Sequence, residues 1–139
     1  MEHAVFPGRY DSLEIICDLV TDQATKAGFD ETAIYAIQTA VDEACSNIIE
    51  HAYQGEDKGS IEVTVTSTDD CITINLADRG IPFNPANIPE PNINGSLDER
   101  DNHGLGLYFM NKLMDKVYFE FSEQAGNTVT MVKCLHHPH

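Results

Sequence analysis

Positively charged residues are scarce in this sequence. Its 139 residues include 8 Lys and Arg against 23 Asp and Glu, which gives a formal net charge of −15. Nucleic acids and anionic membranes both select basic surfaces, so neither is expected as a partner. The acidic balance instead favours a basic protein partner, or a metal cation that bridges the chain to a phosphate-bearing ligand.

Long apolar runs and closely paired cysteines are also absent. No apolar run approaches the roughly 20 residues of a membrane-spanning helix, and the first residues, MEHAVFPGRY, lack the apolar stretch of a signal peptide. A cytoplasmic location is therefore expected. The four cysteines show no CxxC spacing, and each lies in an apolar-periodic stretch. That pattern predicts buried, reduced thiols at Cys17, Cys45, Cys71 and Cys134.

The first half of the sequence has the apolar spacing of helices. Asp11 and Glu14 resemble an N-terminal capping pair, which predicts a helix that ends at Gly28. Asp30 can cap a second, longer helix that runs to about Tyr53, because its apolar residues recur at helical spacing.

The second half changes to the alternating pattern of strands. Residues 60–68 and 71–78 alternate apolar and polar side chains around a turn at Asp69 and Asp70, which predicts a β-hairpin. Residues 84–103 are rich in Asn, Pro and acidic residues and are predicted to form a loop or lid. A third helix is predicted over 104–115. Two further strands then flank a turn at residues 125–127, and a short extended piece, residues 3–7, opens the chain.

The order of these elements indicates the fold class. Strands that follow one another without crossover helices pair antiparallel. Helix, helix, hairpin, loop, helix, hairpin therefore predicts an α+β fold, a two-layer sandwich with a mainly antiparallel sheet and helices on one face. A length of 139 residues is typical of one domain, so a single domain over residues 1–139 is expected.

Two short motifs carry polar residues suited to chemistry. Glu43 and Asn47 are four residues apart on the second predicted helix, so they share a helical face, and His51 follows one turn later. Asp78 places a carboxylate where a strand ends, and Gly80 lets the backbone turn or a planar ligand approach. Taken alone, each motif has an ordinary explanation as a solvated helix face or a turn.

The third motif is a pair of glycines. Gly104 and Gly106 stand at the start of the third predicted helix, directly after the lid-like loop. They lack the Lys-Ser/Thr of a P-loop and the third glycine of a dinucleotide fingerprint. The three motifs in this order, each in a fitting structural context, favour a nucleotide site over coincidence.

These motifs resemble those of a known superfamily. EACSNIIEHAY is similar to the N box of the GHKL ATPases, DRGIPF to their first glycine box and GLGLYFMNKLMD to their second. FPGRYDSLE and MDKVYFEF resemble one branch, the bacterial anti-sigma-factor serine/threonine protein kinases. Glu43, at the first N-box position, points to the same branch. The resemblance covers about residues 6–132 and implies a Bergerat-type ATP-binding fold in a single histidine-kinase-like ATPase domain.

The resemblance implies a role for each matching residue. Asp78 would accept the exocyclic amine of adenine, and Gly80 would let the backbone approach the purine. Asn47 would bind Mg²⁺ through its carbonyl oxygen, and Glu43 would accept the proton of an attacking serine or threonine hydroxyl. Residues 84–103 would close over ATP as a lid. The ATP phosphates would lie against the second glycine box and the residue before it: His103, Gly104, Leu105, Gly106 and Leu107.

Two histidines need separate comment. His103 stands where relatives often carry Arg, which stabilises a transferring phosphate better than an imidazole does, and Arg100 in the same loop is a candidate replacement. His51 matches a family histidine and is interpreted as a structural residue of its helix. Asp42 and Glu50 are interpreted as part of a solvated face.

The function implied by the resemblance is that of a cytoplasmic kinase. It would transfer the γ-phosphoryl group of Mg-ATP to a serine or threonine of an anti-anti-sigma partner of the STAS type. It would thereby regulate the availability of a sigma factor that it also binds, with a homodimer as the common assembly. Three alternatives stay open: a nucleotide-gated partner-binding module without kinase activity, the ATPase half of a histidine kinase, and an acidic scaffold that binds no nucleotide.

Overall fold

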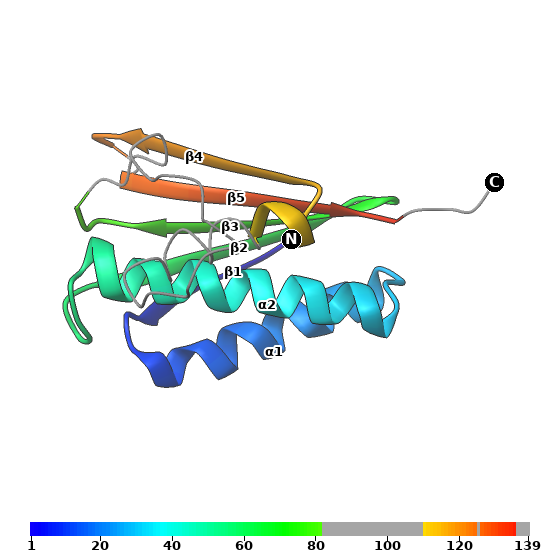
Figure 1. The fold of residues 1–139 in the computed structure, drawn as a ribbon, viewed down its shortest axis with the longest axis horizontal. Helices are drawn as coiled ribbons and strands as arrows, with labels where there is room; N and C mark the ends of the chain where they lie inside the picture. Colours follow the sequence, from blue (N-terminus) through cyan, green and yellow to red (C-terminus); the bar gives the residue numbers. More distant parts are fainter. Residues whose placement is uncertain (82–109, 125, 136–139) are drawn as a thin grey trace, which may run out of the picture.

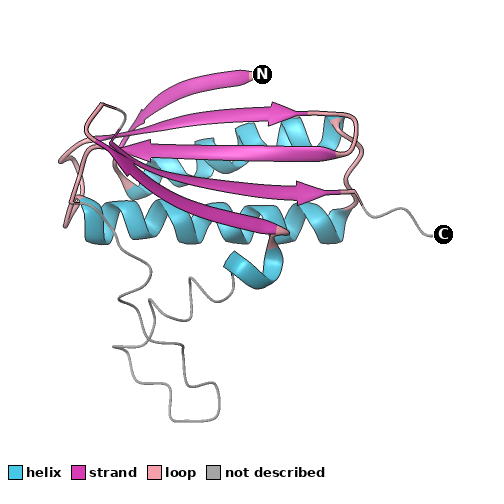
Figure 2. Ribbon diagram, turned by 90° about the horizontal axis from the view of Figure 1, so that it is seen from above, coloured by secondary structure: helices cyan, strands magenta, loops and turns pink. Residues whose placement is uncertain are grey.

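The chain forms two layers, a five-stranded sheet and a pair of helices that cover one of its faces (Figures 1 and 2). The computed structural model describes residues 1–81, 110–124 and 126–135. This α+β sandwich is the predicted fold class. Its elements are β1 (Glu2–Pro7), α1 (Tyr10–Lys26), α2 (Glu31–Asn47), η1 (Ile48–Ala52), β2 (Ser60–Ser67), β3 (Cys71–Asp78), β4 (Lys116–Ser122) and β5 (Gly126–Cys134).

The sheet has the strand order β1-β2-β3-β5-β4, and every neighbouring pair is antiparallel. The predicted hairpin is confirmed as β2 and β3. The β3–β5 pairing is long-range in sequence, and its register runs from Cys71 opposite Cys134 to Asp78 opposite Asn127. These two strands therefore place an acidic residue and an amide side by side at one end of the sheet.

The core lies between the two layers, and its residues recur at the spacing of strands in the sheet and at the spacing of helices in α1 and α2. Alternate residues of β2 and β3 face the helices because the side-chain period of a strand is two, and one stripe of each helix faces the sheet. Full burial of such a side chain contributes about 1.5–3 kcal/mol relative to exposure. Fully buried examples are Ile16, Val20, Ile37, Val41, Ile61, Val63, Ile72, Ile74 and Leu76.

The two long helices begin in different ways. Asp30 caps α2 as predicted, because its carboxylate accepts a hydrogen bond from the Ala33 N–H at 2.9 Å. The predicted capping pair of α1 is wrong. The N-cap of α1 is Arg9, whose side chain makes no capping bond. Instead the Glu56 carboxylate, 46 residues away, accepts from the Tyr10 N–H at 3.0 Å.

The predicted helix to about Tyr53 is helical throughout but changes type. The α-helical part ends at Asn47, and the next five residues form the π-helical turn η1. The Tyr53 N–H donates to the Ile48 carbonyl, five residues back, at 3.0 Å. Single π-turns in longer helices are frequent at functional sites.

Of the predictions for the later part of the chain, one is wrong and two fall wholly or partly outside the described residues. The predicted turn at residues 125–127 is wrong, because Gly126 and Asn127 are the first residues of β5. Of the third predicted helix, residues 110–113 are helical, and its earlier part lies outside the described residues. The predicted lid, residues 84–103, lies outside them as well.

The prediction of four reduced thiols is wrong for one pair. Cys71 and Cys134 form a disulfide, whereas Cys17 and Cys45 are free. The strand register is the reason, since it places Cys71 directly opposite Cys134 although 63 residues separate them. Within the described residues, no helix combines the length and the apolar character needed to cross a membrane.

Candidate functional site

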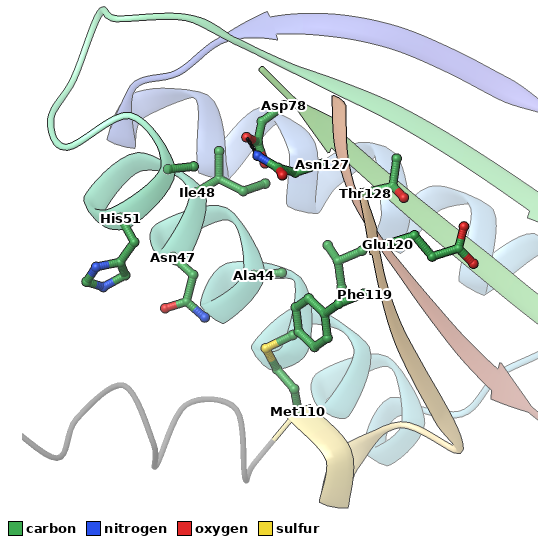
Figure 3. Close-up of a pocket in the computed structure, with 12 residues that line it drawn as sticks. Ala44, Asn47, Ile48, His51, Asp78, Met110, Phe119, Glu120, Asn127 and Thr128 are labelled. Carbon is green, nitrogen blue, oxygen red and sulfur yellow. Dashed lines mark hydrogen bonds between the residues drawn. The ribbon is translucent and has the colours of Figure 1, made fainter. Parts of the chain in front are cut away.

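A pocket opens between the end of α2, η1 and the three strands β3, β5 and β4 (Figure 3). About 490 Å³ of space lies within the pocket and at its opening to solvent. Half of its lining is apolar: Ala44, Ile48, Ala52, Met110, Phe119 and Val129. The other half is polar: Asn47, His51, Asp78, Glu120, Asn127 and Thr128.

The deepest polar group of this pocket is the Asp78 carboxylate, and Figure 3 shows it beside Asn127. Asp78 is 6% exposed. Its Oδ1 accepts from Asn127 Nδ2 at 2.8 Å and from the Gly80 N–H at 2.9 Å. Burial raises the pKa of Asp78, and these two hydrogen bonds act in the opposite direction. Because both bonds use Oδ1, Oδ2 remains the acceptor that Asp78 can offer to a ligand.

Asn127 is a site residue that sequence reasoning missed. Besides Asp78, its Nδ2 donates to the carbonyl groups of Gly80 at 3.1 Å and Ile81 at 3.3 Å. Its Oδ1 is buried and has no hydrogen-bond partner among the described residues. Turning the amide over would place that oxygen against the Asp78 carboxylate, so the orientation is fixed. A buried acceptor without a partner costs about 1–3 kcal/mol, which calls for a donor from a ligand or a water molecule.

Glycine is required at two positions around Asp78. A Cβ atom on Gly80 would lie 2.3 Å from the Ala52 carbonyl oxygen, and a Cβ on Gly126 would lie 2.3 Å from the Asp78 carbonyl oxygen. Gly126 also has a φ of +78°, a conformation that favours glycine. Packing against Ala52 therefore explains why residue 80 is glycine. The expected approach of a purine to Gly80 stays a prediction.

The first two sequence motifs are joined through the end of η1. The Tyr53 hydroxyl accepts from the Arg79 N–H at 3.0 Å and donates to the Ser60 carbonyl at 2.6 Å. The Ile81 N–H donates to the Ala52 carbonyl at 2.8 Å. These contacts fix the segment after β3 against the helix that carries Asn47.

Asn47 and His51 form the outer, polar part of the pocket. They lie one turn apart, and Figure 3 shows both side chains pointing to the same side, away from Asp78. His51 Nε2 is 3.8 Å from Glu50 Oε2, and Glu50 Oε1 accepts from the Tyr10 hydroxyl at 2.9 Å. His51 therefore belongs to the pocket as well as to its helix. Among the described residues that line this pocket, it is the one side chain that can carry positive charge.

The remaining predicted site residues are not among those that line the pocket in the described part of the chain. Glu43 lies on α2 one turn before Asn47 and is half-buried, and it is not among the described residues that line the pocket. His103, Gly104, Leu105, Gly106 and Leu107 lie outside the described residues. The roles of these six residues stay predictions.

The residues of the pocket fit a metal ion that is coordinated mainly by the bound phosphate compound and by water. Within the described residues, no three His, Cys, Asp or Glu side chains group around a possible metal position. The Asn47 amide oxygen is the type of ligand that Mg²⁺ accepts when waters and phosphate oxygens complete its octahedron. The pocket thus combines an apolar slot, a buried carboxylate at its base and an amide at its mouth.

Known proteins share both the sequence and the fold of this chain. Residues 6–133 match the histidine kinase-like ATPase domain family. The serine-protein kinase RsbW of Bacillus cereus (strain ATCC 10987 / NRS 248) is 34% identical over 133 residues, which are 93% of this chain and 81% of that relative. RsbW of Bacillus mycoides (strain KBAB4) is 33% identical over the same shares.

Two solved structures have the same fold. One contains the RsbU and RsbW domains of Rv1364c from Mycobacterium tuberculosis, with a TM-score of 0.66 and 16% identity. The match covers 99% of this chain but 32% of that one. The other is the catalytic domain of the histidine kinase ThkA, with a TM-score of 0.55, 16% identity, and coverage of 96% and 97%. The chain belongs to the histidine kinase-like ATPase domain family, in the group of serine-protein kinases that includes RsbW.

Proposed function

We propose that this protein transfers the γ-phosphoryl group of Mg-ATP to a serine or threonine of an anti-anti-sigma partner of the STAS type. Family membership supports the reaction class. The observation that carries the nucleotide assignment is the buried Asp78–Asn127 pair at the base of an apolar slot. Through the partner, the kinase would control how much of a sigma factor is free.

Asp78 selects adenine over guanine in this proposal. Its free Oδ2 accepts a hydrogen bond from the exocyclic amine of adenine, and a bond to a carboxylate is worth about 1.5–3 kcal/mol. Guanine has a carbonyl oxygen at the corresponding ring position, and two acceptors repel each other. The apolar side chains of Ile48, Met110 and Phe119 would provide contact area for the ring.

The phosphates of ATP lie toward Asn47 and His51 in this proposal, because the opposite end of the slot is closed by an acid. Mg²⁺, when bound, supplies positive charge that neutralises the phosphate oxygens, and the Asn47 amide oxygen would hold it. His51, whose Nε2 lies 3.8 Å from Glu50 Oε2, would add a donor to the phosphates. An acidic chain with a net charge of −15 needs such groups to hold a polyanion.

Glu43 is the proposed general base. It lies one helical turn from Asn47, so a carboxylate on that face can take the proton of a hydroxyl nucleophile that attacks the γ-phosphorus. Phosphoryl transfer depends mostly on positioning and charge neutralisation. Loss of the base is therefore expected to lower the rate of transfer while ATP still binds.

The partners and the assembly belong to the same proposal. A STAS-type anti-anti-sigma factor receives the phosphate, a sigma factor competes for the kinase, and two copies of the kinase pair as a homodimer. The acidic surface suits a basic patch on the sigma factor, and such a complex should weaken as salt rises.

Partner phosphorylation gives a direct test. The kinase is incubated with Mg-ATP and purified STAS-type domains from the source organism, and the mass of each domain is measured. We expect one added phosphate on a serine or threonine, transfer that is lost in Glu43→Gln, and normal transfer in the exposed control Glu14→Gln. Nucleotide-dependent complex formation without any added phosphate would contradict the kinase assignment and favour a nucleotide-gated binding module.

A further inference from the structure

The Cys71–Cys134 disulfide lies on the sheet face that the helices leave open. Its two residues are directly opposite in the β3–β5 register, with Cα atoms 4.0 Å apart. Cys71 precedes Ile72, which is fully buried against the helices, and successive side chains of a strand point to opposite faces. Both cysteines are half-buried. A small thiol or disulfide reagent can therefore reach the bond without opening the core.

The other two cysteines are chemically quiet by comparison. Burial, followed by the neighbouring Asp42 carboxylate, raises the pKa of Cys17 to about 12. Cys45 is fully buried, and burial raises its thiol pKa as well. Thiolate is the reactive form of cysteine, so neither residue competes in thiol exchange. Among the cysteines, thiol–disulfide exchange is therefore expected at the Cys71–Cys134 pair.

The bonded end of β5 anchors a wall of the nucleotide pocket. The Cys134 N–H donates to Asp115 Oδ2 at 2.7 Å, and the Asp115 N–H donates to the Val132 carbonyl at 2.9 Å. Lys133 Nζ donates to the Leu113 carbonyl at 2.8 Å. These bonds hold the end of helical residues 110–113, which begin with the pocket residue Met110.

We infer that Cys71 and Cys134 form a reversible redox clamp on this wall of the pocket. Glutathione disulfide is the proposed oxidant. One thiolate attacks it and releases one glutathione thiol, and the second thiolate then displaces the other glutathione. Two protein thiols thus lose two electrons and two protons as glutathione disulfide becomes two glutathione thiols. In reducing compartments the disulfides that do occur are usually transient and redox-sensing.

The clamp acts on nucleotide affinity, and this part rests on the function proposed above. With the bond formed, the end of β5 is fixed to β3 and holds residues 113–115 in place. With the bond reduced, the end of β5 is held by hydrogen bonds alone, among them the Leu135 N–H to the Asp70 carbonyl at 2.6 Å. The pocket wall at Met110 then loses part of its support, so the reduced protein should bind ATP more weakly.

The experiment measures the bond and its effect on the whole chain. The protein is equilibrated in buffers of reduced and oxidised glutathione, free thiols are trapped by alkylation, and peptide mass locates them. Calorimetry then gives the Kd for ATP of each form. We expect reversible oxidation of Cys71 and Cys134 alone, and a Kd about fivefold higher after reduction. The redox response should vanish in Cys71→Ser/Cys134→Ser and persist in the matched control Cys17→Ser.

Two results would overturn the clamp: thiols at 71 and 134 that glutathione disulfide does not oxidise, or equal ATP affinity in the two forms. If neither form binds ATP, the proposed function fails, and amide hydrogen exchange then decides the clamp by itself. Reduction should speed exchange at Asp115, whose N–H is bonded to the Val132 carbonyl. Unchanged exchange there would also refute it.

Discussion

The two ends of the β3–β5 pairing are joined by different kinds of side-chain bond. At one end a covalent bond joins Cys71 to Cys134 on the open face of the sheet. At the other end Asp78 and Asn127 are joined by a 2.8 Å hydrogen bond on the face that is covered by the helices. Seven ladder steps separate the two pairs, as the register from Cys71 to Asp78 shows.

The difference separates stability from recognition. A disulfide acts mainly by restricting the unfolded chain and leaves no group to offer a ligand. The Asp78–Asn127 pair does the reverse. Burial of the Asp78 carboxylate, and of an Asn127 amide oxygen without a hydrogen-bond partner among the described residues, destabilises the folded state. Oδ2 of Asp78 is left as an acceptor for a ligand. Breaking the disulfide should therefore change stability more than ATP affinity, and breaking the Asp78–Asn127 pair should change ATP affinity more than stability.

Removal of the disulfide should have the largest effect. In the chain-entropy account, a bond that spans 63 residues stabilises the oxidised protein by about 4 kcal/mol. Cys71→Ser/Cys134→Ser should therefore unfold about 10 °C below the oxidised wild type in calorimetry. Its Kd for ATP should rise only about fivefold, as in the reduced wild type. An oxidised wild type and a double variant with the same unfolding temperature would contradict this division of roles.

Asp78→Asn should strongly weaken ATP binding and leave stability almost unchanged. Replacement of the acceptor by an amide turns a donor toward the adenine amine, so we expect the Kd for ATP to rise by about 100-fold or more, equivalent to about 2.7 kcal/mol. The pKa of Asp78 is raised in the folded state, so its ionised form costs stability above that pKa. Loss of the charge should leave the unfolding temperature at pH 7 unchanged or higher.

Asp69→Asn is the matched control for this variant. Asp69 is exposed in the turn before β3, so the same chemical change there should alter neither binding nor stability. Tight ATP binding by Asp78→Asn would remove Asp78 from the adenine site.

Sequence patterns predicted what is local in this fold. The alternation of 71–78 and the helical spacing after Asp30 each depend on residues that are near in sequence, and both elements form as expected. The cap of α1 escaped prediction because its acceptor, Glu56, is 46 residues away. The nearby Asp11 is the cap that the local sequence predicts, but the Glu56 carboxylate accepts the hydrogen bond from the first turn of α1 instead.

The missed part of the site has the same cause. The sequence predicts a turn at residues 125–127, since a glycine beside Asn127 is typical of turns. The alternation of β5, read backwards from Met131 through Val129, could have placed Asn127 on the buried face. Its contact with Asp78, like that between Cys71 and Cys134, depends on the pairing of β3 with β5, which no single-strand pattern specifies.

Asn127→Ala should weaken the recognition end without abolishing it. Loss of one donor to Asp78 Oδ1 should raise the Kd for ATP about tenfold at pH 7. The Asn127 bond lowers the pKa of Asp78, so its removal raises that pKa further. Binding that needs the ionised carboxylate should then fall at a higher pH than in the wild type as the solution is acidified. Identical pH profiles of Kd in the two proteins would show that Asn127 does not tune Asp78.

His51→Gln should give the smallest effect and should separate the two parts of the pocket. His51 lies beside Asn47, away from Asp78, so under the proposed function it should contact the phosphates rather than the purine. Because its side chain is 35% exposed, solvent screens the contact, and we expect the Kd for ATP to rise by about threefold while that for adenosine stays the same. His3→Gln is the control, since His3 pairs with Glu62 on β2 at 3.1 Å. An equal loss for ATP and adenosine would mean that His51 only supports the helix, as its sequence context alone suggested.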